Sequence, residues 1–164
     1  MKFCWLIGIL ILLLPSCDIS YGMLDQSIDA ETFSVDVFEE EASNAPAGYG
    51  ISYTEFLRDY MLSRTKLNLK KSDADIEISG KIVGYQTSPA AVQSDESAAL
   101  NKLEVTISVT VINNIDEKQS FKQNFRQFSN YNASQQLSAV EEELLEDING
   151  RLSQDIINKL SSNW

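Results

Sequence analysis

The sequence predicts an α+β fold: a two-layer sandwich in which two helices cover one face of a four-stranded sheet, in the order β-α-β-β-β-α. Apolar and polar residues alternate in several segments, as they do in strands that bury one face. In two other segments apolar residues recur at helical spacing. A sheet with one apolar face and an amphipathic helix each need an apolar surface to pack against, so we expect the helices to cover the apolar face of the sheet.

The first strand is expected at residues 30–38, where Phe33, Val35 and Val37 alternate with polar residues. A loop rich in Asn, Pro and Gly follows at residues 44–50 and marks a turn before the first helix.

The first helix is predicted to begin at a capping box, because Ser52 and Glu55 have the S-x-x-E spacing. Ile51 is expected to pack against Phe56 as a hydrophobic staple. The helix should extend to about Lys66, and its apolar stripe is predicted to be core: Phe56, Leu57, Tyr60 and Met61.

The second strand is expected at about residues 75–85. Its apolar face is formed by Ile76, Ile78 and Ile82, whereas Lys81 points to the other side. Gly80 and Gly84 fall on the apolar face, where a missing side chain would let a helix pack closely.

The third strand, at residues 102–113, has the most regular alternation in the chain. One face is apolar: Leu103, Val105, Ile107, Val109 and Val111. The other face is polar: Glu104, Thr106, Ser108 and Thr110. A hairpin loop at residues 113–118 should lead into the fourth strand, at about residues 119–131, which carries Phe121, Phe125 and Phe128.

The last helix is expected at about residues 135–160. Its continuous apolar stripe comprises Leu137, Val140, Leu144, Ile148, Leu152, Ile156 and Leu160. Glu141, Glu142 and Glu143 lie in its early turns and Lys159 near its end, which suits the helix dipole. Gly150 interrupts the helix at a cost of about 1 kcal/mol.

The pattern of residues 1–16 predicts that they form a lipoprotein signal peptide. Lys2 supplies a positive charge, and the apolar run at residues 3–14 is shorter than the roughly 20 residues of a membrane span. Leu-Pro-Ser-Cys at residues 14–17 resembles the bacterial lipobox, so Cys17 is expected to be lipidated and to anchor the mature chain. An ordinary secretory signal or an uncleaved anchor is the alternative, and Asp18 leaves the choice of membrane open. Residues 17–29 are expected to form a tether and residues 30–164 the folded domain.

The composition excludes several functions. The 164 residues carry a formal charge of −11, or −12 without the leader, so nucleic acid is not an expected partner. The chain has no histidine, which excludes histidine-dependent nucleophiles and histidine zinc sites. Cys4 and Cys17 are its only cysteines, so the folded domain should have neither a disulfide nor a cysteine metal site. No cofactor or metal is expected.

Three stretches carry a resemblance to a known family: SPAAVQSDESAALNKLEVTISVTVIN (88–113), FKQNFRQFSNY (121–131) and SAVEEELLEDINGRLSQDIINKLSSNW (138–164). Together with the lipobox cysteine, the A-x-L-N-[KR]-L entry to the third strand and the terminal Asn-Trp, they resemble a divergent branch of the LptE family of lipopolysaccharide-assembly lipoproteins. The likeness covers roughly residues 18–164.

The resemblance implies a non-enzymatic role at the outer membrane. Members of the family plug a large β-barrel translocon, LptD, help it to fold, and contact lipopolysaccharide on its way to the cell surface. The implied partners are therefore an LptD-like barrel, lipopolysaccharide, and the membrane through the lipid anchor.

The polar sheet face is predicted to meet the hydrated lumen of the barrel, together with the loop at residues 86–100. The candidate partner-facing residues are Lys81, Ser94, Glu104, Thr106, Ser108, Lys122 and Arg126. The alternative for the loop is that it is merely a surface connection.

The densest basic cluster is Lys66, Lys70 and Lys71. These lysines are candidates for contact with lipopolysaccharide phosphates, although cations also suit a helix C-terminus. Glu141, Glu142 and Glu143 diverge by about 100° per residue on a helix and predict a solvated face rather than a catalytic carboxylate pair.

Two other classes of function remain open. One is an enzyme, such as a lipoprotein glycosidase, which the missing histidines and the lack of a cleft-forming signal disfavour. The other is a generic membrane-anchored periplasmic binding module, or a pilotin for another outer-membrane pore. The protein that co-purifies from membranes would distinguish them.

Overall fold

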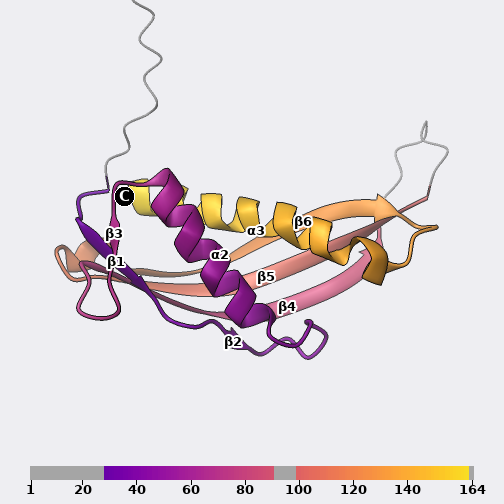
Figure 1. The fold of residues 1–164 in the computed structure, drawn as a ribbon, viewed down its shortest axis with the longest axis horizontal. Helices are drawn as coiled ribbons and strands as arrows, with labels where there is room; N and C mark the ends of the chain where they lie inside the picture. Colours follow the sequence, from indigo (N-terminus) through magenta and orange to yellow (C-terminus); the bar gives the residue numbers. More distant parts are fainter. Residues whose placement is uncertain (1–27, 91–98, 163–164) are drawn as a thin grey trace, which may run out of the picture.

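The computed structural model describes residues 28–90 and 99–162, in which two helices lie on one face of a single sheet (Figure 1). The elements in chain order are β1 (Thr32–Val35), β2 (Glu39–Glu40), α2 (Tyr49–Arg64), β3 (Asn68–Leu69), β4 (Ile76–Pro89), β5 (Leu100–Asn113), the 3-10 turn η2 (Glu117–Gln119), β6 (Phe121–Asn132) and α3 (Leu137–Ser161).

The α+β class with two helices is confirmed, but the sheet has six strands rather than four. Its order is β3-β1-β4-β5-β6, and β2 also pairs with β4. The single strand predicted at residues 30–38 is in fact two short strands, β1 and β2, which both run parallel to β4. The prediction missed β3 because two residues are too few to show alternation.

The core lies between the sheet and the helices. The five aliphatic residues predicted for one face of β5, from Leu103 to Val111, are each at most 1% exposed, so this assignment is confirmed. On α3 the predicted stripe is buried at its centre, at Leu144, Ile148, Leu152 and Ile156. Full burial of each such side chain contributes roughly 1.5–3 kcal/mol.

Helix α2 begins earlier than predicted, because it follows Gly48, whose φ of +82° lies in the left-handed region. Ser52 is therefore inside the first turn, where its hydroxyl donates to the Gly48 carbonyl, and the predicted capping box is wrong. The staple is wrong too, since Ile51 is 55% exposed. The backbone N–H of Gly50 donates instead to the Glu40 carboxylate at 2.9 Å, so an acid from β2 stabilises the helix start.

A register shift between Ile82 and Gly84 changes which side chains of β4 face the helices. Beyond the shift Gly84 pairs with Thr106 on the polar face, so its predicted place on the apolar face is wrong. Tyr85 takes the apolar side instead and is 6% exposed. Gly80 does lie on the apolar face, but the close neighbour is the Phe38 ring rather than a helix.

Strand β6 does not place its three phenylalanines together. Phe121 and Phe125 are an even number of residues apart and both face the helices, where Phe125 is buried. Phe128 lies an odd number further on, pairs with Glu104 on the polar face and is 43% exposed.

Several predictions concern residues outside the described ranges: the signal peptide, Cys17, most of the tether, and Ser94 with the centre of the 86–100 loop. The ends of that loop are strand, since β4 continues to Pro89 and Ala90 still donates to the Leu100 carbonyl. Within residues 28–90 and 99–162, neither helix has the length and apolar character that a membrane crossing requires.

Candidate functional site

The sheet face opposite the helices is the candidate functional surface. Register places Lys81 beside Ser108, Arg126 beside Thr106, and Lys122 beside Thr110. The six predicted partner-facing residues that the structure describes therefore share one face: Lys81, Glu104, Thr106, Ser108, Lys122 and Arg126. Their role in binding a partner remains a prediction.

Glu104 is the most buried charge on this face, at 7% exposed. One carboxylate oxygen lies 2.9 Å from the Lys102 ammonium, and the other accepts from the Gln86 amide at 2.9 Å, with Arg126 at 3.8 Å. The hydrogen bond from Lys102 is the main reason that the pKa of the Glu104 carboxyl is lowered, and burial opposes it. The carboxylate is thus held ionised among three strands.

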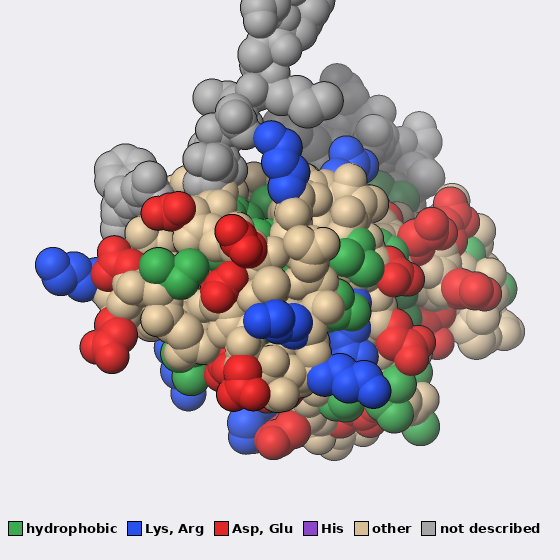
Figure 2. All heavy atoms as spheres, turned by 60° about the vertical axis from the view of Figure 1, so that its left-hand side comes forward, with side chains coloured by type: hydrophobic (Ala, Val, Ile, Leu, Met, Phe, Trp, Pro, Cys, Tyr) green, Lys and Arg blue, Asp and Glu red, His purple; other side chains and the backbone are tan. Residues whose placement is uncertain are grey.

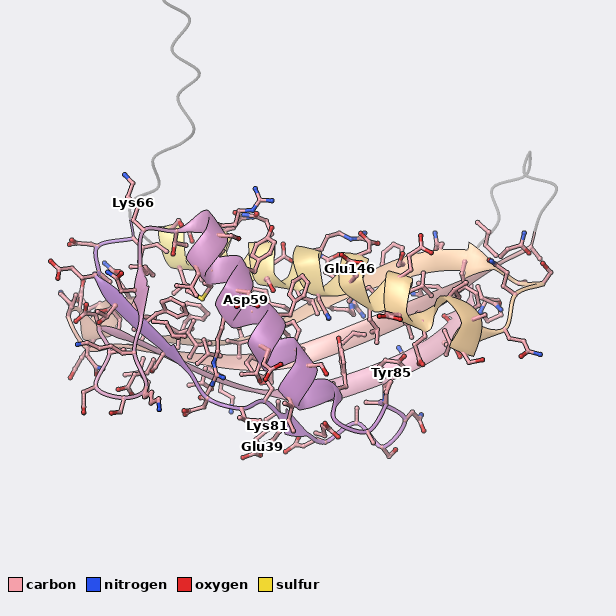
Figure 3. The ribbon with its side chains drawn as sticks, viewed as in Figure 1. Glu39, Asp59, Lys66, Lys81, Tyr85 and Glu146 are labelled. Atoms are coloured by element: carbon pink, nitrogen blue, oxygen red, sulfur yellow. The ribbon has the colours of Figure 1, made fainter. Side chains whose placement is uncertain are left out.

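Lys81 joins β4 to the segment around β2 (Figure 3). Its ammonium lies 2.6 Å from Glu41 and 2.9 Å from Glu39, and these carboxylates raise the pKa of Lys81, with Glu41 contributing most. The Lys81 side chain is 45% exposed, so water screens both ion pairs. The cluster fixes the lysine rather than leaving it available to a ligand.

A small hollow of about 170 Å³ lies next to Lys81. The hydroxyl-bearing residues Ser79, Ser108 and Thr110 line it, and Lys122 stands beside them. Lys122 forms no ion pair within the part of the chain that the structure describes. Asp36 and Glu39 also line the hollow, so it offers hydroxyl groups and charges of both signs to a polar partner.

Lys66, Lys70 and Lys71 are all exposed. Lys66 lies between the end of α2 and β3 (Figure 3), whereas Lys70 and Lys71 follow β3. Lys70 lies near Asp75, whose pKa is lowered mainly by hydrogen bonding with Thr32 and to a smaller extent by that lysine. Figure 2 shows basic and acidic side chains interspersed on the face in view, rather than one basic patch.

The consecutive residues Glu141, Glu142 and Glu143 of α3 have different surroundings. Glu141 accepts a hydrogen bond from the Tyr85 hydroxyl, whereas Glu142 and Glu143 are exposed. Within residues 28–90 and 99–162, no group of three or more acidic or cysteine side chains is placed to hold a metal ion.

Sequence reasoning missed the partners of Lys81, because they depend on the parallel pairing of β2 with β4. It also missed a groove between the two helices, whose walls come from residues nearly a hundred positions apart. No local sequence signal marks either feature.

A family model described as "LptE: Lipopolysaccharide-assembly" matches residues 30–160. A minor lipoprotein from Acinetobacter baumannii has a similar structure, with a TM-score of 0.50 and 14% identity over 82% of this chain and 94% of that one. A hypothetical protein from Chlamydia trachomatis has a TM-score of 0.54 and 10% identity, over 80% of this chain and 96% of that one. A protein from Xanthomonas campestris has a TM-score of 0.53 and 9% identity, over 77% of this chain and 81% of that one. At these identities the likeness concerns the fold alone. No curated protein sequence matches the chain.

Proposed function

The chain belongs to the LptE family of lipopolysaccharide-assembly proteins, and we propose that it is a lipid-anchored, non-enzymatic component of the outer-membrane lipopolysaccharide translocon. Membership links the chain to lipopolysaccharide assembly in general. The finer part of the proposal is that the domain plugs and stabilises an LptD-like β-barrel and assists the insertion of lipopolysaccharide at the cell surface.

The observation that carries this proposal is the polar sheet face. Both helices occupy the apolar side of the sheet, which leaves β4, β5 and β6 to present a mixed surface of hydroxyl, amide and charged groups on the other side (Figure 1). The interior of a large outer-membrane barrel is polar and hydrated. Such a lumen matches a face that needs hydrogen-bonding partners and carries charges of both signs.

The proposed contact with lipopolysaccharide phosphates has two candidate positions. Lys122 lines the hollow with Ser79, Ser108 and Thr110 and forms no ion pair in the described part of the chain, and a phosphate there would also lie near Asp36 and Glu39. The cluster of Lys66, Lys70 and Lys71 is the weaker candidate, because it lies away from the polar face, around β3. A phosphate would be bound by charge-assisted hydrogen bonds at either position.

Photo-cross-linking in intact cells tests the barrel and the orientation together. A photoreactive amino acid at Thr106 or Ser94 should capture an LptD-like barrel. The matched control is Ile51, which is 55% exposed on the helix layer and should capture no barrel. Capture from Ile51 alone would reverse the orientation, and capture of a different outer-membrane pore from Thr106 would favour the pilotin alternative. No barrel from any position would overturn the proposed function.

A further inference from the structure

A groove of about 510 Å³ lies between the helices, on the side of the molecule away from the polar sheet face. One wall is the loop at residues 46–47 and the first turns of α2, which contribute Tyr49 and Phe56. The other wall is α3, which contributes Leu145 and Asn149. Its volume is in the range of specific ligand sites, and its lining includes apolar and aromatic side chains.

The charged side chains that line this groove are all acidic. Glu141, Glu142 and Glu146 line the α3 wall, and the lining contains no lysine or arginine. Glu142 and Glu146 are exposed and form no ion pair with any residue in 28–90 or 99–162. The groove thus combines an apolar wall with uncompensated negative charge.

Asn149 contributes a hydrogen-bonding group to the groove. It is only 7% exposed, and its Oδ1 accepts from the Tyr49 hydroxyl at 2.7 Å. The amide Nδ2 has no acceptor among the described residues, although the side chain lines the groove. The Nδ2 donor is accessible rather than buried, so an occupant that brings a carbonyl oxygen into the groove can accept from it.

The chain itself does not supply a cationic occupant from its remaining segments. Residues 18–27 and 91–98 contain acidic residues but neither lysine nor arginine, and the leader contains only Lys2. A single metal ion does not fit either, because no three acidic side chains of the described residues are placed to hold one. A cationic occupant of the groove is therefore neither residues 18–27 nor 91–98 nor a single metal ion, and a segment with its charge distributed along the groove fits better.

We propose that the groove between α2 and α3 binds a short basic peptide segment of a partner protein, in which lysine or arginine alternates with apolar residues. The basic side chains pair with Glu142 and Glu146, an apolar side chain packs on Phe56 and Leu145, and a backbone carbonyl accepts from Nδ2 of Asn149. The three contacts match the three kinds of group that line the groove.

The test uses the mature lipidated protein in neutral phosphatidylcholine nanodiscs and the peptide acetyl-LRLKL-amide, followed by nuclear magnetic resonance. We expect saturable binding that shifts the Asn149 side-chain amide signal. Glu142→Gln with Glu146→Gln should weaken binding about tenfold, because two charge contacts are lost. The matched control, Glu143→Gln with Glu117→Gln, removes the same charge from exposed positions outside the groove and should change affinity by less than about twofold.

Two further peptides separate the contributions. Acetyl-SRSKS-amide lacks the apolar side chains and acetyl-LELEL-amide lacks the positive charge, so both should bind much more weakly. Equal loss in the two double variants would indicate non-specific attraction to an acidic protein and would overturn the proposal. Shifts confined to the sheet face, or a dimer that the peptide dissociates, would overturn it as well, the latter by identifying a second copy as the occupant.

Discussion

Replacing Gly80 by alanine should destabilise the domain, because the ring of Phe38 occupies the space that a Cβ atom would need. A Cβ built on Gly80 overlaps Cε1 of that ring and lies 2.7 Å from Cζ. Phe38 is 2% exposed, and its ring meets the Tyr53 ring edge-on with centroids 5.0 Å apart. The ring cannot move away without disturbing the packing beneath α2.

The expected cost follows from the overlap. Forcing an extra methyl group into a packed core costs about 1–3 kcal/mol, and the reduced entropy of the unfolded chain offsets about 0.4–1 kcal/mol of this. We therefore expect the free energy of unfolding to fall by about 1–2 kcal/mol. Equilibrium unfolding in urea, followed by circular dichroism, measures this directly.

Gly150→Ala is the matched control. A Cβ at Gly150 in α3 meets nothing within 4 Å, so the same substitution should there raise the free energy of unfolding by about 0.5–1 kcal/mol. In a Phe38→Ala background the cost of Gly80→Ala should largely disappear, because the two positions compete for one space. If Gly80→Ala is neutral or stabilising in the wild-type background, the packing of Phe38 on β4 is wrong.

Three further predictions concern the core, the polar face and the anchor. Val109→Asp places a charge at a fully buried position and should lower the free energy of unfolding by at least about 3 kcal/mol; an unchanged urea midpoint would contradict the facing of β5. Glu104 has a lowered pKa in the folded state, so its contribution to stability is present above its ordinary pKa of 4.5 and is lost as pH falls through the lowered value. Below about pH 4.5 the free energy of unfolding should therefore fall less steeply with pH in Glu104→Gln than in the wild type. Identical plots of the free energy of unfolding against pH would refute this. Cys17→Ala should abolish metabolic labelling by palmitate, and persistent label would show that the lipobox interpretation is wrong.

The parts of the fold that could be predicted are those with long, regular patterns. On β5 the alternation extends from Leu103 to Val111, so both the position of the strand and its buried face follow from sequence. The apolar stripe of α3 extends along a longer element of 25 residues. The polar face of the sheet could also be predicted from the sequence, because antiparallel pairing of alternating strands brings Thr106, Arg126 and their neighbours to one side.

The features that could not be predicted depend on contacts between distant segments. The spacing of Ser52 and Glu55 satisfies a capping box, but it occurs equally well inside a helix that starts elsewhere. Helix α2 starts at Tyr49 because Glu40 accepts from Gly50, and Thr54 both donates to the Gly50 carbonyl and accepts from Phe38. Glu40 and Phe38 belong to a segment that the helix meets only after folding.

The register shift in β4 connects the two faces of the molecule. Without it, Gly84 would lie on the helix side and Tyr85 would point outward beside the polar groups of β5. With it, the Tyr85 ring meets the Tyr49 ring edge-on at 6.1 Å and its hydroxyl donates to Glu141 on α3. Tyr49 in turn donates to Asn149, so one irregularity in the sheet positions residues on both walls of the groove between the helices. In a sheet with perfect alternation Tyr85 would not contact Tyr49 and Glu141. The periodicity that predicted the sheet therefore could not predict the groove.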